Sequence, residues 1–170
     1  MNDINLRELF RRVEKGDPEA FETIYRELST PICTICYRIT QSREAAEDIA
    51  HDVFMKLYSA PPDPSVGNLR AWIFQMARNL SIDALRKNAR SAGPEEPTHT
   101  GDDFARIQAR MDLESAFRKL APEEREILTL YLNADLKFQE ISRILGLSLA
   151  ATYRKYRKAL KKLQTELNGG

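Results

Sequence analysis

The stretch Ser148-Leu-Ala-Ala-Thr-Tyr-Arg-Lys-Tyr-Arg-Lys-Ala-Leu-Lys-Lys-Leu163, close to the end of the chain, decides the predicted fold. At the helical period of about 100° per residue, its apolar and cationic side chains separate onto different faces. One narrow face holds Leu149, Tyr153, Tyr156, Leu160, Leu163 and Leu167, and the other holds Arg154, Lys155, Arg157, Lys158, Lys161 and Lys162. No acidic residue interrupts these cations, so the pattern predicts an amphipathic helix with a strongly basic face.

A shorter helix is predicted directly before the basic helix. Phe138, Ile141 and Ile144 follow helical spacing. Gly146 can adopt the positive φ that ends a helix, and Ser148 can then cap the next one. A short helix, a tight turn containing glycine and a longer basic helix are typical of the helix-turn-helix motif, whose second helix enters the major groove of DNA.

A basic helix face also has other interpretations. Such a face is often only solvated, and it also suits a membrane surface or an acidic partner. The helix and turn in front of it favour nucleic acid, because a helix that lies on a membrane needs no second helix locked before it.

The composition predicts an all-helical protein. Of the 170 residues, 42% are hydrophobic, which is enough for the core of one domain or of two small ones. Helix-forming residues dominate, glycines number only 7, and the alternation typical of strands is absent. The formal net charge is +1, so the position of the charges is more informative than their sum. The chain has no apolar stretch long enough to span a bilayer and no signal-peptide pattern, so we expect a cytoplasmic protein.

Four helices are predicted before residue 60. The first contains Leu6 and Val13 and ends at Gly16. Asp17 and Pro18 are the N-cap and first residue expected of the second helix. The apolar residues expected to be buried by the second helix are Phe21, Ile24, Tyr25 and Leu28. Thr30 and Pro31 repeat the cap and proline pattern and predict the start of a third helix, and Ser42 predicts a fourth over residues 43–58.

The fourth predicted helix has two faces of different kinds. Its inward stripe includes Ile49, Val53 and Leu57, and the opposite face carries Asp48, His51, Asp52 and Met55. An acidic face is often only solvated, but an exposed methionine among acids also suits docking onto a basic partner helix.

A proline-rich segment and a long helix follow. Residues 59–67 contain three prolines and a glycine and are not expected to be helical. The next predicted helix covers residues 68–89, with Trp72 and Ile73 on its inward side. Its polar residues include Gln75, Arg78 and Asn79, and Arg86, Lys87 and Arg90 make its end basic. Cations at a C-terminus also complement the helix dipole, which explains part of this pattern without DNA.

Residues 91–103 carry no bulky apolar side chain and predict a flexible linker between two helical domains. We expect one domain at residues 1–90, a linker at 91–111 and a second domain of four helices at 112–168. Such a linker permits both a compact and an extended arrangement of the two domains.

Several segments, taken in order, resemble the bacterial RNA polymerase sigma factors of the extracytoplasmic-function group, the two-domain members of the sigma-70 family. Segments that resemble the first domain of the family are Gly16-Asp-Pro-Glu-Ala-Phe-Glu-Thr-Ile-Tyr25, Ala46-Glu-Asp-Ile-Ala-His-Asp-Val-Phe-Met-Lys-Leu57 and Leu69-Arg-Ala-Trp-Ile-Phe-Gln-Met-Ala-Arg-Asn-Leu80. Segments that resemble the second domain are Leu120-Ala-Pro-Glu-Glu-Arg-Glu-Ile-Leu128 and Glu140-Ile-Ser-Arg-Ile-Leu-Gly-Leu-Ser148. Each segment alone is weak evidence for the resemblance, but the order and spacing of all five together are specific to the family.

The resemblance implies that the acidic helix docks on the clamp coiled coil of the polymerase core, through Asp48, His51, Asp52 and Met55. His51 stands where the family usually has glutamine. Neutral imidazole still offers one hydrogen-bond donor and one acceptor, but its protonation would make docking depend on pH.

For the promoter −10 element, the resemblance implies that the loop at residues 59–68 captures a base flipped out of the DNA. Asn79 would help to line the pocket, since polar contacts can offset the cost of unstacking a base. The full set of predicted −10 contacts is Asn68, Gln75, Arg78, Asn79, Arg86, Lys87 and Arg90, of which the cations would hold phosphates.

For the −35 element, the resemblance implies that the basic helix reads bases, where arginine can contact guanine and alanine a thymine methyl group. The predicted contacts are Ser148, Ala150, Ala151, Arg154, Lys155, Arg157, Lys158, Lys161 and Lys162, with Arg157, Lys161 and Lys162 assigned to the DNA backbone. The segment Ala151-Thr-Tyr-Arg-Lys155 replaces the family's usual Thr-Val-Lys-Ser-Arg, so the promoter sequence does not carry over from relatives.

The resemblance further implies a polymerase flap contact and an anti-sigma partner. It leaves two rival functions: a sigma mimic that only titrates an anti-sigma factor, and a plain helix-turn-helix regulator. The mimic needs no cationic recognition helix, and the regulator leaves the acidic helix unexplained.

Metal binding and catalysis find little support in the sequence. Cys33 and Cys36 have the spacing of a metal or redox pair, but both fall in an apolar helical pattern without a second Cys/His pair, so we expect core thiols. His99 lies in the predicted linker. We recognise no phosphate-binding glycine loop, nucleophile and base pair or metal motif, and we therefore predict no enzyme, no cofactor and no metal.

Overall fold

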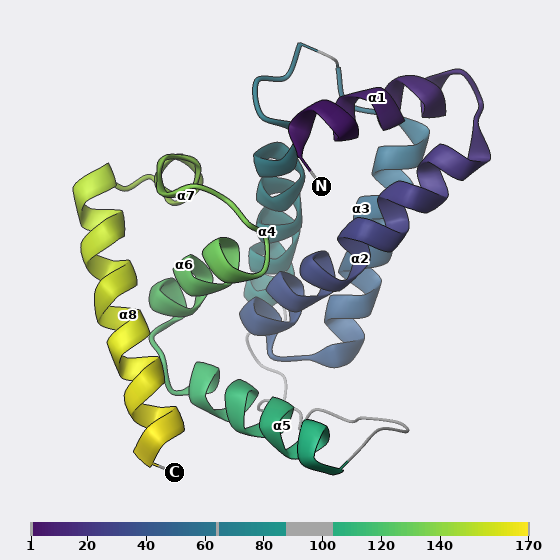
Figure 1. The fold of residues 1–170 in the computed structure, drawn as a ribbon. Helices are drawn as coiled ribbons and strands as arrows, with labels where there is room; N and C mark the ends of the chain where they lie inside the picture. The colour runs from purple at the N-terminus through teal and green to yellow at the C-terminus, as the bar shows by residue number, and fades with distance from the viewer. Residues whose placement is uncertain (1, 64, 88–103, 170) are drawn as a thin grey trace.

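The computed structural model describes residues 2–63, 65–87 and 104–169, with residues 104–108 described by their backbone alone. Over these ranges the chain forms eight helices and no strand, which confirms the all-helical fold (Figure 1). The helices are α1 (Asp3–Glu14), α2 (Pro18–Thr40), α3 (Arg43–Ser59), α4 (Leu69–Lys87), α5 (Phe104–Arg118), α6 (Pro122–Leu132), α7 (Phe138–Leu145) and α8 (Leu149–Gly169). Arg90, His99 and the expected linker residues 91–103 lie outside the described residues, and α5 begins at Phe104.

Two of the predicted caps set the starts of α2 and α3. The Asp17 carboxylate accepts a hydrogen bond from the Glu19 N–H at 3.0 Å, at the start of α2. Ser42 Oγ accepts from the Ala45 N–H at 3.2 Å and begins α3. Each cap satisfies a backbone donor that has no partner within the helix.

The helix break predicted at Thr30 and Pro31 is wrong, because Pro31 lies inside the continuous helix α2. One buried stripe, Ile24, Leu28, Ile32, Ile35 and Ile39, runs through both halves of this helix. A proline inside a helix removes one hydrogen bond, at a cost of about 3 kcal/mol. Burial of several branched side chains along one stripe outweighs this cost, at roughly 1.5–3 kcal/mol for each side chain.

The start of α4 is held by α1. Asn68 caps α4 by accepting a hydrogen bond from the Ala71 N–H at 2.9 Å. The Asp3 carboxylate accepts two more, from the N–H groups of Leu69 at 2.9 Å and Arg70 at 3.1 Å. These bonds satisfy backbone donors at the N-terminus of α4 and fix the helix against α1.

The helix-turn-helix motif forms as predicted, from α7, a turn and α8. Gly146 ends α7 with a positive φ of 68°, a conformation that glycine adopts without steric cost. Ser148 Oγ accepts a hydrogen bond from the Ala151 N–H at 3.1 Å and begins α8.

The prediction for the buried face of α8 is only partly right. The face against the other helices carries Thr152, Ala159 and Leu163, all buried. Leu149, Tyr153 and Leu167 are exposed. At about 100° per residue, the buried face is rotated by roughly 60° from the centre of the apolar stripe. Half of the stripe therefore remains on the surface.

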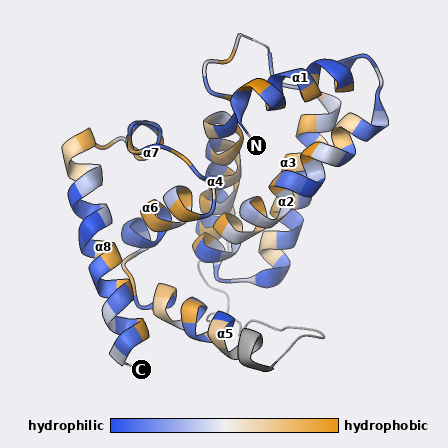
Figure 2. Ribbon diagram, viewed as in Figure 1, coloured by the Kyte–Doolittle hydropathy of each residue, from blue (hydrophilic) through white to orange (hydrophobic). Residues whose placement is uncertain are grey.

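The two helical halves pack against each other. One buried apolar cluster joins side chains of α1–α4 to Ile127, Leu130, Leu136, Ile141 and Ile144 of the second half. A second cluster, around Phe117, Leu128 and Leu163, lies within α5–α8. Hydrophobic residues concentrate on α2, α4 and α6 where these helices meet (Figure 2). The predicted linker allows a compact and an extended arrangement of the two halves, and the structure has the compact one.

Candidate functional site

The acidic face of α3 lies on the surface. Asp48, His51, Asp52 and Met55 are all exposed, and their spacing places them on one side of the helix. The opposite side, including Val53 and Leu57, is fully buried and therefore fixes the orientation of this face. All four residues predicted from the sequence are thus brought together on one exposed face.

Aromatic side chains lie next to the acidic face, at the junction of α2 and α3. The rings of Phe21 and Tyr58 meet edge to face at 5.0 Å, and Tyr25 lies 4.7 Å from Phe54. Tyr25 is 52% exposed, although its position in the apolar pattern predicted burial. Tyr58 is also exposed and was missed by the sequence analysis. An exposed aromatic pair beside carboxylates is a surface suited to a protein partner.

An open pocket lies between the end of α3 and the middle of α4, with a volume of about 310 Å³. Its lining includes two of the predicted −10 residues, Gln75 and Asn79, both exposed. The residues that complete the pocket are Lys56, Trp72, Met76 and Leu80.

The loop at residues 59–68 was expected to capture a flipped base together with Asn79, but none of the loop residues that the structure describes lines this pocket. Arg7 instead donates hydrogen bonds to the carbonyl oxygens of Val66 and Gly67 and thereby holds the loop beside α1.

Sequence reasoning missed Lys56 and placed Trp72 in the core. The structure leaves Trp72 half-buried at the wall of the pocket. The sequence offers one indication that Lys56 belongs to the site. Lys56 directly follows Met55 of the acidic face and begins the last turn of α3.

Two of the predicted −10 residues are already hydrogen-bonded to the second half of the chain. Arg78 Nε lies 2.8 Å from the Glu126 carboxylate, and the Asn68 side-chain amide donates to Glu140. Arg86 and Lys87 are exposed at the end of α4. The described −10 residues therefore divide into an exposed group and a group engaged within the molecule.

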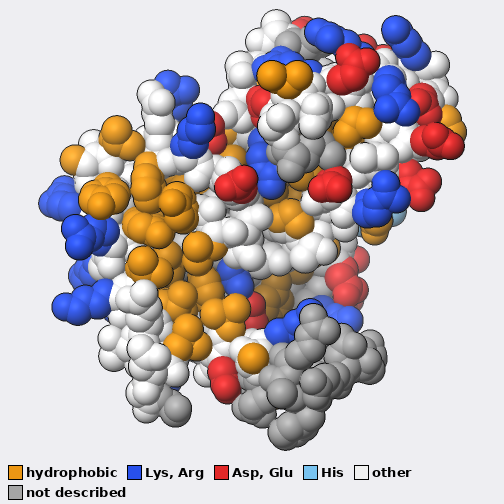
Figure 3. All heavy atoms as spheres, in the orientation of Figure 1, with side chains coloured by type: hydrophobic (Ala, Val, Ile, Leu, Met, Phe, Trp, Pro, Cys, Tyr) orange, Lys and Arg blue, Asp and Glu red, His pale blue; other side chains and the backbone are white. Residues whose placement is uncertain are grey.

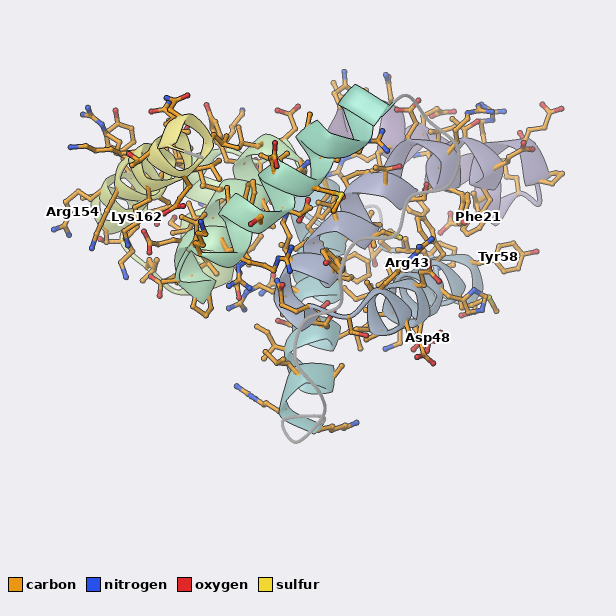
Figure 4. All side chains as sticks on the ribbon, turned by 90° about the horizontal axis from the view of Figure 1, so that it is seen from below. Phe21, Arg43, Asp48, Tyr58, Arg154 and Lys162 are labelled. Atoms are coloured by element: carbon orange, nitrogen blue, oxygen red, sulfur yellow. The ribbon has the colours of Figure 1, made fainter. Side chains whose placement is uncertain are left out.

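The cations of α8 also divide into two groups. Arg154, Arg157, Lys158 and Lys161 are exposed on the side away from the buried face. Lys155 pairs with Glu123, and Lys162 pairs with Glu124 at 2.9 Å, both across to α6. Ser148 and Ala150 are exposed and Ala151 is half-buried at the start of the helix. Figure 3 shows basic side chains along the outer edge of α8, and in Figure 4 Arg154 and Asp48 lie far apart, on opposite sides of the molecule.

An apolar patch covers the neighbouring face of the second half (Figure 3). Tyr131 stacks on Phe138 at 4.7 Å, and Tyr156 contacts both rings at 4.8 Å. Leu132 and Leu149 are half-exposed beside them. Exposed apolar surface of this kind marks interaction sites.

Two family models match the chain, and together they account for most of it. Sigma-70 region 2 matches residues 24–91, and Sigma-70 region 4 matches residues 110–163. The chain belongs to the sigma-70 family of RNA polymerase sigma factors. The acidic helix α3 and the pocket on α4 fall in region 2, and the helix-turn-helix falls in region 4.

Similar proteins place this sigma factor in the ECF type. It is 24% identical over 183 residues to the ECF RNA polymerase sigma factor SigW of Bacillus subtilis, covering 97% of this chain and 98% of that protein. It is 28% identical over 135 residues to the ECF sigma factor RpoE of Cereibacter sphaeroides, covering 76% and 74%. As an ECF sigma factor, the chain directs transcription initiation through regions 2 and 4, and it is a non-enzymatic subunit of RNA polymerase.

Two solved structures share the fold. CnrH, in complex with the cytosolic domain of CnrY, matches with a TM-score of 0.69 at 23% identity, over 97% of this chain and 98% of that one. RpoE of Bartonella quintana, in complex with the anti-sigma factor NepR, matches with a TM-score of 0.71 at 19% identity, over 87% and 96%.

The two cysteines of the sigma factor lie in the interior of region 2. Cys36 is fully buried in the apolar cluster of α1–α4, and Cys33 is partly buried one turn before it. Burial raises the pKa of the Cys36 thiol to about 11 and also raises the pKa of Cys33, where the charge of Glu47 adds to the effect. In the described part of the chain, no three His, Cys, Asp or Glu side chains gather as metal ligands would.

Thiol labelling tests this description of the cysteines. Because only the thiolate reacts and the Cys36 pKa is about 11, roughly one Cys36 in a thousand is ionised at pH 8. We expect iodoacetamide to modify Cys33 first and to leave Cys36 unmodified until the chain is unfolded, as peptide mass spectrometry would show. In denaturant both thiols should react equally. Equal rates in the folded chain would contradict the burial of Cys36.

Among the helices that the structure describes, none is both long enough and apolar enough to cross a membrane.

Proposed function

We propose that this sigma factor docks on core RNA polymerase through α3 and reads its promoter with two other surfaces, α4 at the −10 element and α8 at the −35 element. The observation that carries the proposal is the separation of charge. An exposed acidic face on region 2 and an exposed basic face on region 4 lie far apart, on opposite sides of the molecule (Figure 4). A chain with this arrangement can engage a basic protein surface and DNA phosphates without either blocking the other.

The core contact is proposed for the exposed face of α3. Asp48 and Asp52 would pair with cations of the polymerase clamp coiled coil, while Met55 and Tyr58 supply adaptable apolar contact. His51 lies on the same exposed face.

The −10 contact is proposed for the pocket on α4. Trp72 offers an apolar wall for a flipped base, and the Asn79 amide offers both a donor and an acceptor to the Watson–Crick edge. Lys56 at the rim would hold a phosphate, which carries no sequence information. The pocket therefore combines one group suited to select a base with one suited to bind any sequence.

Replacing Asn79 by alanine tests the −10 pocket. In a transcription assay with core polymerase and a promoter library randomised over the −10 element, we expect the variant to lose base preference at one position. The loss should correspond to about 1–3 kcal/mol of discrimination, because one side chain reads one base. The Lys56→Ala variant should lower initiation evenly over all sequences.

The matched control for Asn79 is Asn5→Ala, an exposed asparagine on α1. It should leave the library profile unchanged. If Asn79→Ala and Asn5→Ala gave the same profile, the pocket would not be the base-reading site.

The −35 contact is proposed for the exposed side of α8. Arg154, Lys155 and Lys158 would face the groove with Ala150 and Ala151 beside them. The remaining cations, Arg157, Lys161 and Lys162, would neutralise phosphates. Lys155 first has to leave Glu123.

The apolar patch around Tyr131, Phe138 and Tyr156 is proposed as the contact for the polymerase flap. Its half-buried rings and the exposed Leu132 offer an apolar surface that a protein partner would cover. CnrH and the Bartonella quintana RpoE were solved with CnrY and with the anti-sigma factor NepR, respectively, and we propose that an anti-sigma factor likewise binds this chain.

Two further proposals follow from the same function. An initiation subunit acts where the polymerase is, so we propose a cytoplasmic protein. We also keep the domain boundaries at residues 1–90 and 112–168, each domain holding one half of the promoter contact.

A further inference from the structure

Lys155 differs from the other cations that are proposed to face the groove. Arg154 and Lys158 are exposed, and Arg154 points outward from α8 (Figure 4). At about 100° per residue, Lys155 lies about 100° around the helix from Arg154, on the side beside α6. There it is half-buried, and its ammonium group pairs with the carboxylate of Glu123. One of the three groove-facing cations is therefore already bound to an acid.

This acid is held in place by region 4 itself. Glu123 lies in the first turn of α6. The helix α6 packs on α8 through a buried apolar cluster that includes Leu128 and Leu163. Both partners of the ion pair lie within the matched region at residues 110–163. The packing inside this one region therefore keeps Glu123 beside Lys155.

The neighbouring acid, Glu124, has a different role. Its side chain is only 9% exposed, and its carboxylate accepts hydrogen bonds from the Ala121 N–H at 3.3 Å and from Lys162 at 2.9 Å. Glu124 therefore caps α6 and joins it to α8. Glu123 is 43% exposed, and Lys155 is its one partner among the contacts that the structure describes. An exposed pair of this kind contributes little to stability, so Glu123 can be replaced without loss of the fold.

The ion pair opposes one step of the proposed −35 contact. A lysine reads guanine by donating hydrogen bonds to its O6 and N7 atoms in the major groove. To donate there, Lys155 has to exchange the Glu123 carboxylate for the base. In a sequence that offers no guanine at this position, Lys155 can stay on Glu123, and no ion pair is broken. The carboxylate thus lowers the affinity for guanine alone, by a factor of up to about five for an exposed pair.

We propose that Glu123 is a specificity-determining residue of the −35 site, which reduces the preference for guanine at the one position that Lys155 reads. The inference rests on the proposed −35 contact of α8, and it adds a residue of α6 that does not itself touch the base. Glu123 acts through Lys155, as a competing acceptor, so its effect should disappear when Lys155 is absent.

The test compares Glu123→Gln with the wild type, in holoenzyme assembled from core polymerase and the full chain. Glutamine keeps the shape of the side chain and removes its charge. Binding is measured by competition between duplexes that carry every single base change over the −35 element. The preference for guanine at one position should rise by about two- to fivefold, while the preferences at the other positions stay as in the wild type. Glu123→Ala also removes the carboxylate and should give the same rise, which keeps the test valid if the glutamine variant does not fold.

The matched control is Glu166→Gln, which removes the same charge from an acid of α8. Glu166 pairs with Lys119 at 2.7 Å, and Lys119 has no assigned contact with DNA, so this variant should leave the −35 preferences unchanged. Lys155→Ala and Glu123→Gln/Lys155→Ala complete a double-mutant cycle, and these two variants should have the same preferences. A carboxylate that merely repels DNA phosphates would instead weaken binding to every sequence, with or without Lys155.

If Lys155→Ala loses a guanine preference that Glu123→Gln does not raise, the inference is overturned and the proposed −35 contact stands. The inference is also overturned if Glu123→Gln strengthens binding equally to all sequences, or if its effect persists in the double variant. If Lys155→Ala changes no base preference, the proposed base contact of Lys155 fails, and the inference fails with it.

Discussion

Replacing Asp48 and Asp52 together by asparagine is expected to lower the affinity of the sigma factor for core polymerase by roughly 100-fold. Two close charge pairs across an interface, each contributing about 1.5 kcal/mol or more, account for a loss of this size. Both carboxylates are exposed on α3, so their removal should leave the buried side of the helix and the melting temperature unchanged. The measurement is a titration of labelled sigma factor with purified core, by fluorescence polarisation.

The control for this variant removes two carboxylates of α1, away from the acidic face of α3. Glu8 and Glu14 are exposed on α1, and Glu8→Gln/Glu14→Gln should bind core as the wild type does. The affinity of the Asp48/Asp52 variant should also depend less steeply on salt, because it has lost charge at the interface. Unchanged core affinity in the Asp48/Asp52 variant would move the interface to another surface.

Replacing Arg154 by alanine is expected to cost about 1–3 kcal/mol of discrimination between −35 sequences. Arg154 is exposed and forms no ion pair among the described residues, so it is available for a base edge. Lys155 should act in the same way, with a smaller loss because its side chain must first leave Glu123. The measurement is competition binding of the holoenzyme to duplexes that differ at single −35 positions.

Lys161→Ala is the matched variant, since Lys161 lies on the same exposed side of α8 but is assigned to the DNA backbone. It should weaken binding evenly over all sequences and reduce the slope of affinity against salt by about one. Equal effects of Arg154, Lys155 and Lys161 on every sequence would refute this division of roles.

Local signals in the sequence predicted the helix boundaries that depend on one or two residues. Asp17 and Ser42 cap their helices, and Gly146 takes the positive φ of the turn, because each of these conformations is set by neighbouring residues. The acidic face of α3 was predictable for the same reason, since helical period alone places its four residues on one side.

Features that depend on distant partners were not predictable in the same way. Pro31 remains helical because the stripe of apolar side chains on α2 is buried along its whole length. A rule based on neighbouring residues alone does not include this packing. Leu149 and Tyr153 look like core residues in the pattern, but α6 and α7 meet α8 on a neighbouring face.

The pairing of Arg38 with Glu114 joins residues 76 positions apart, and nothing in the sequence around Arg38 marks it as buried. The pocket on α4 likewise has a wall that the local pattern did not indicate. Its second wall comes from the end of α3 in place of the proline-rich loop, which Arg7 holds beside α1.

Initiation by core polymerase on a promoter library, with and without the purified chain, tests the central assignment most directly. We expect transcripts that start at defined positions downstream of shared −35 and −10 sequences only when the chain is present, and we expect the Asp48/Asp52 variant to lose them. A sigma mimic or a plain helix-turn-helix regulator would give no such transcripts with core alone. The absence of specific starts with the folded wild-type chain would contradict the account.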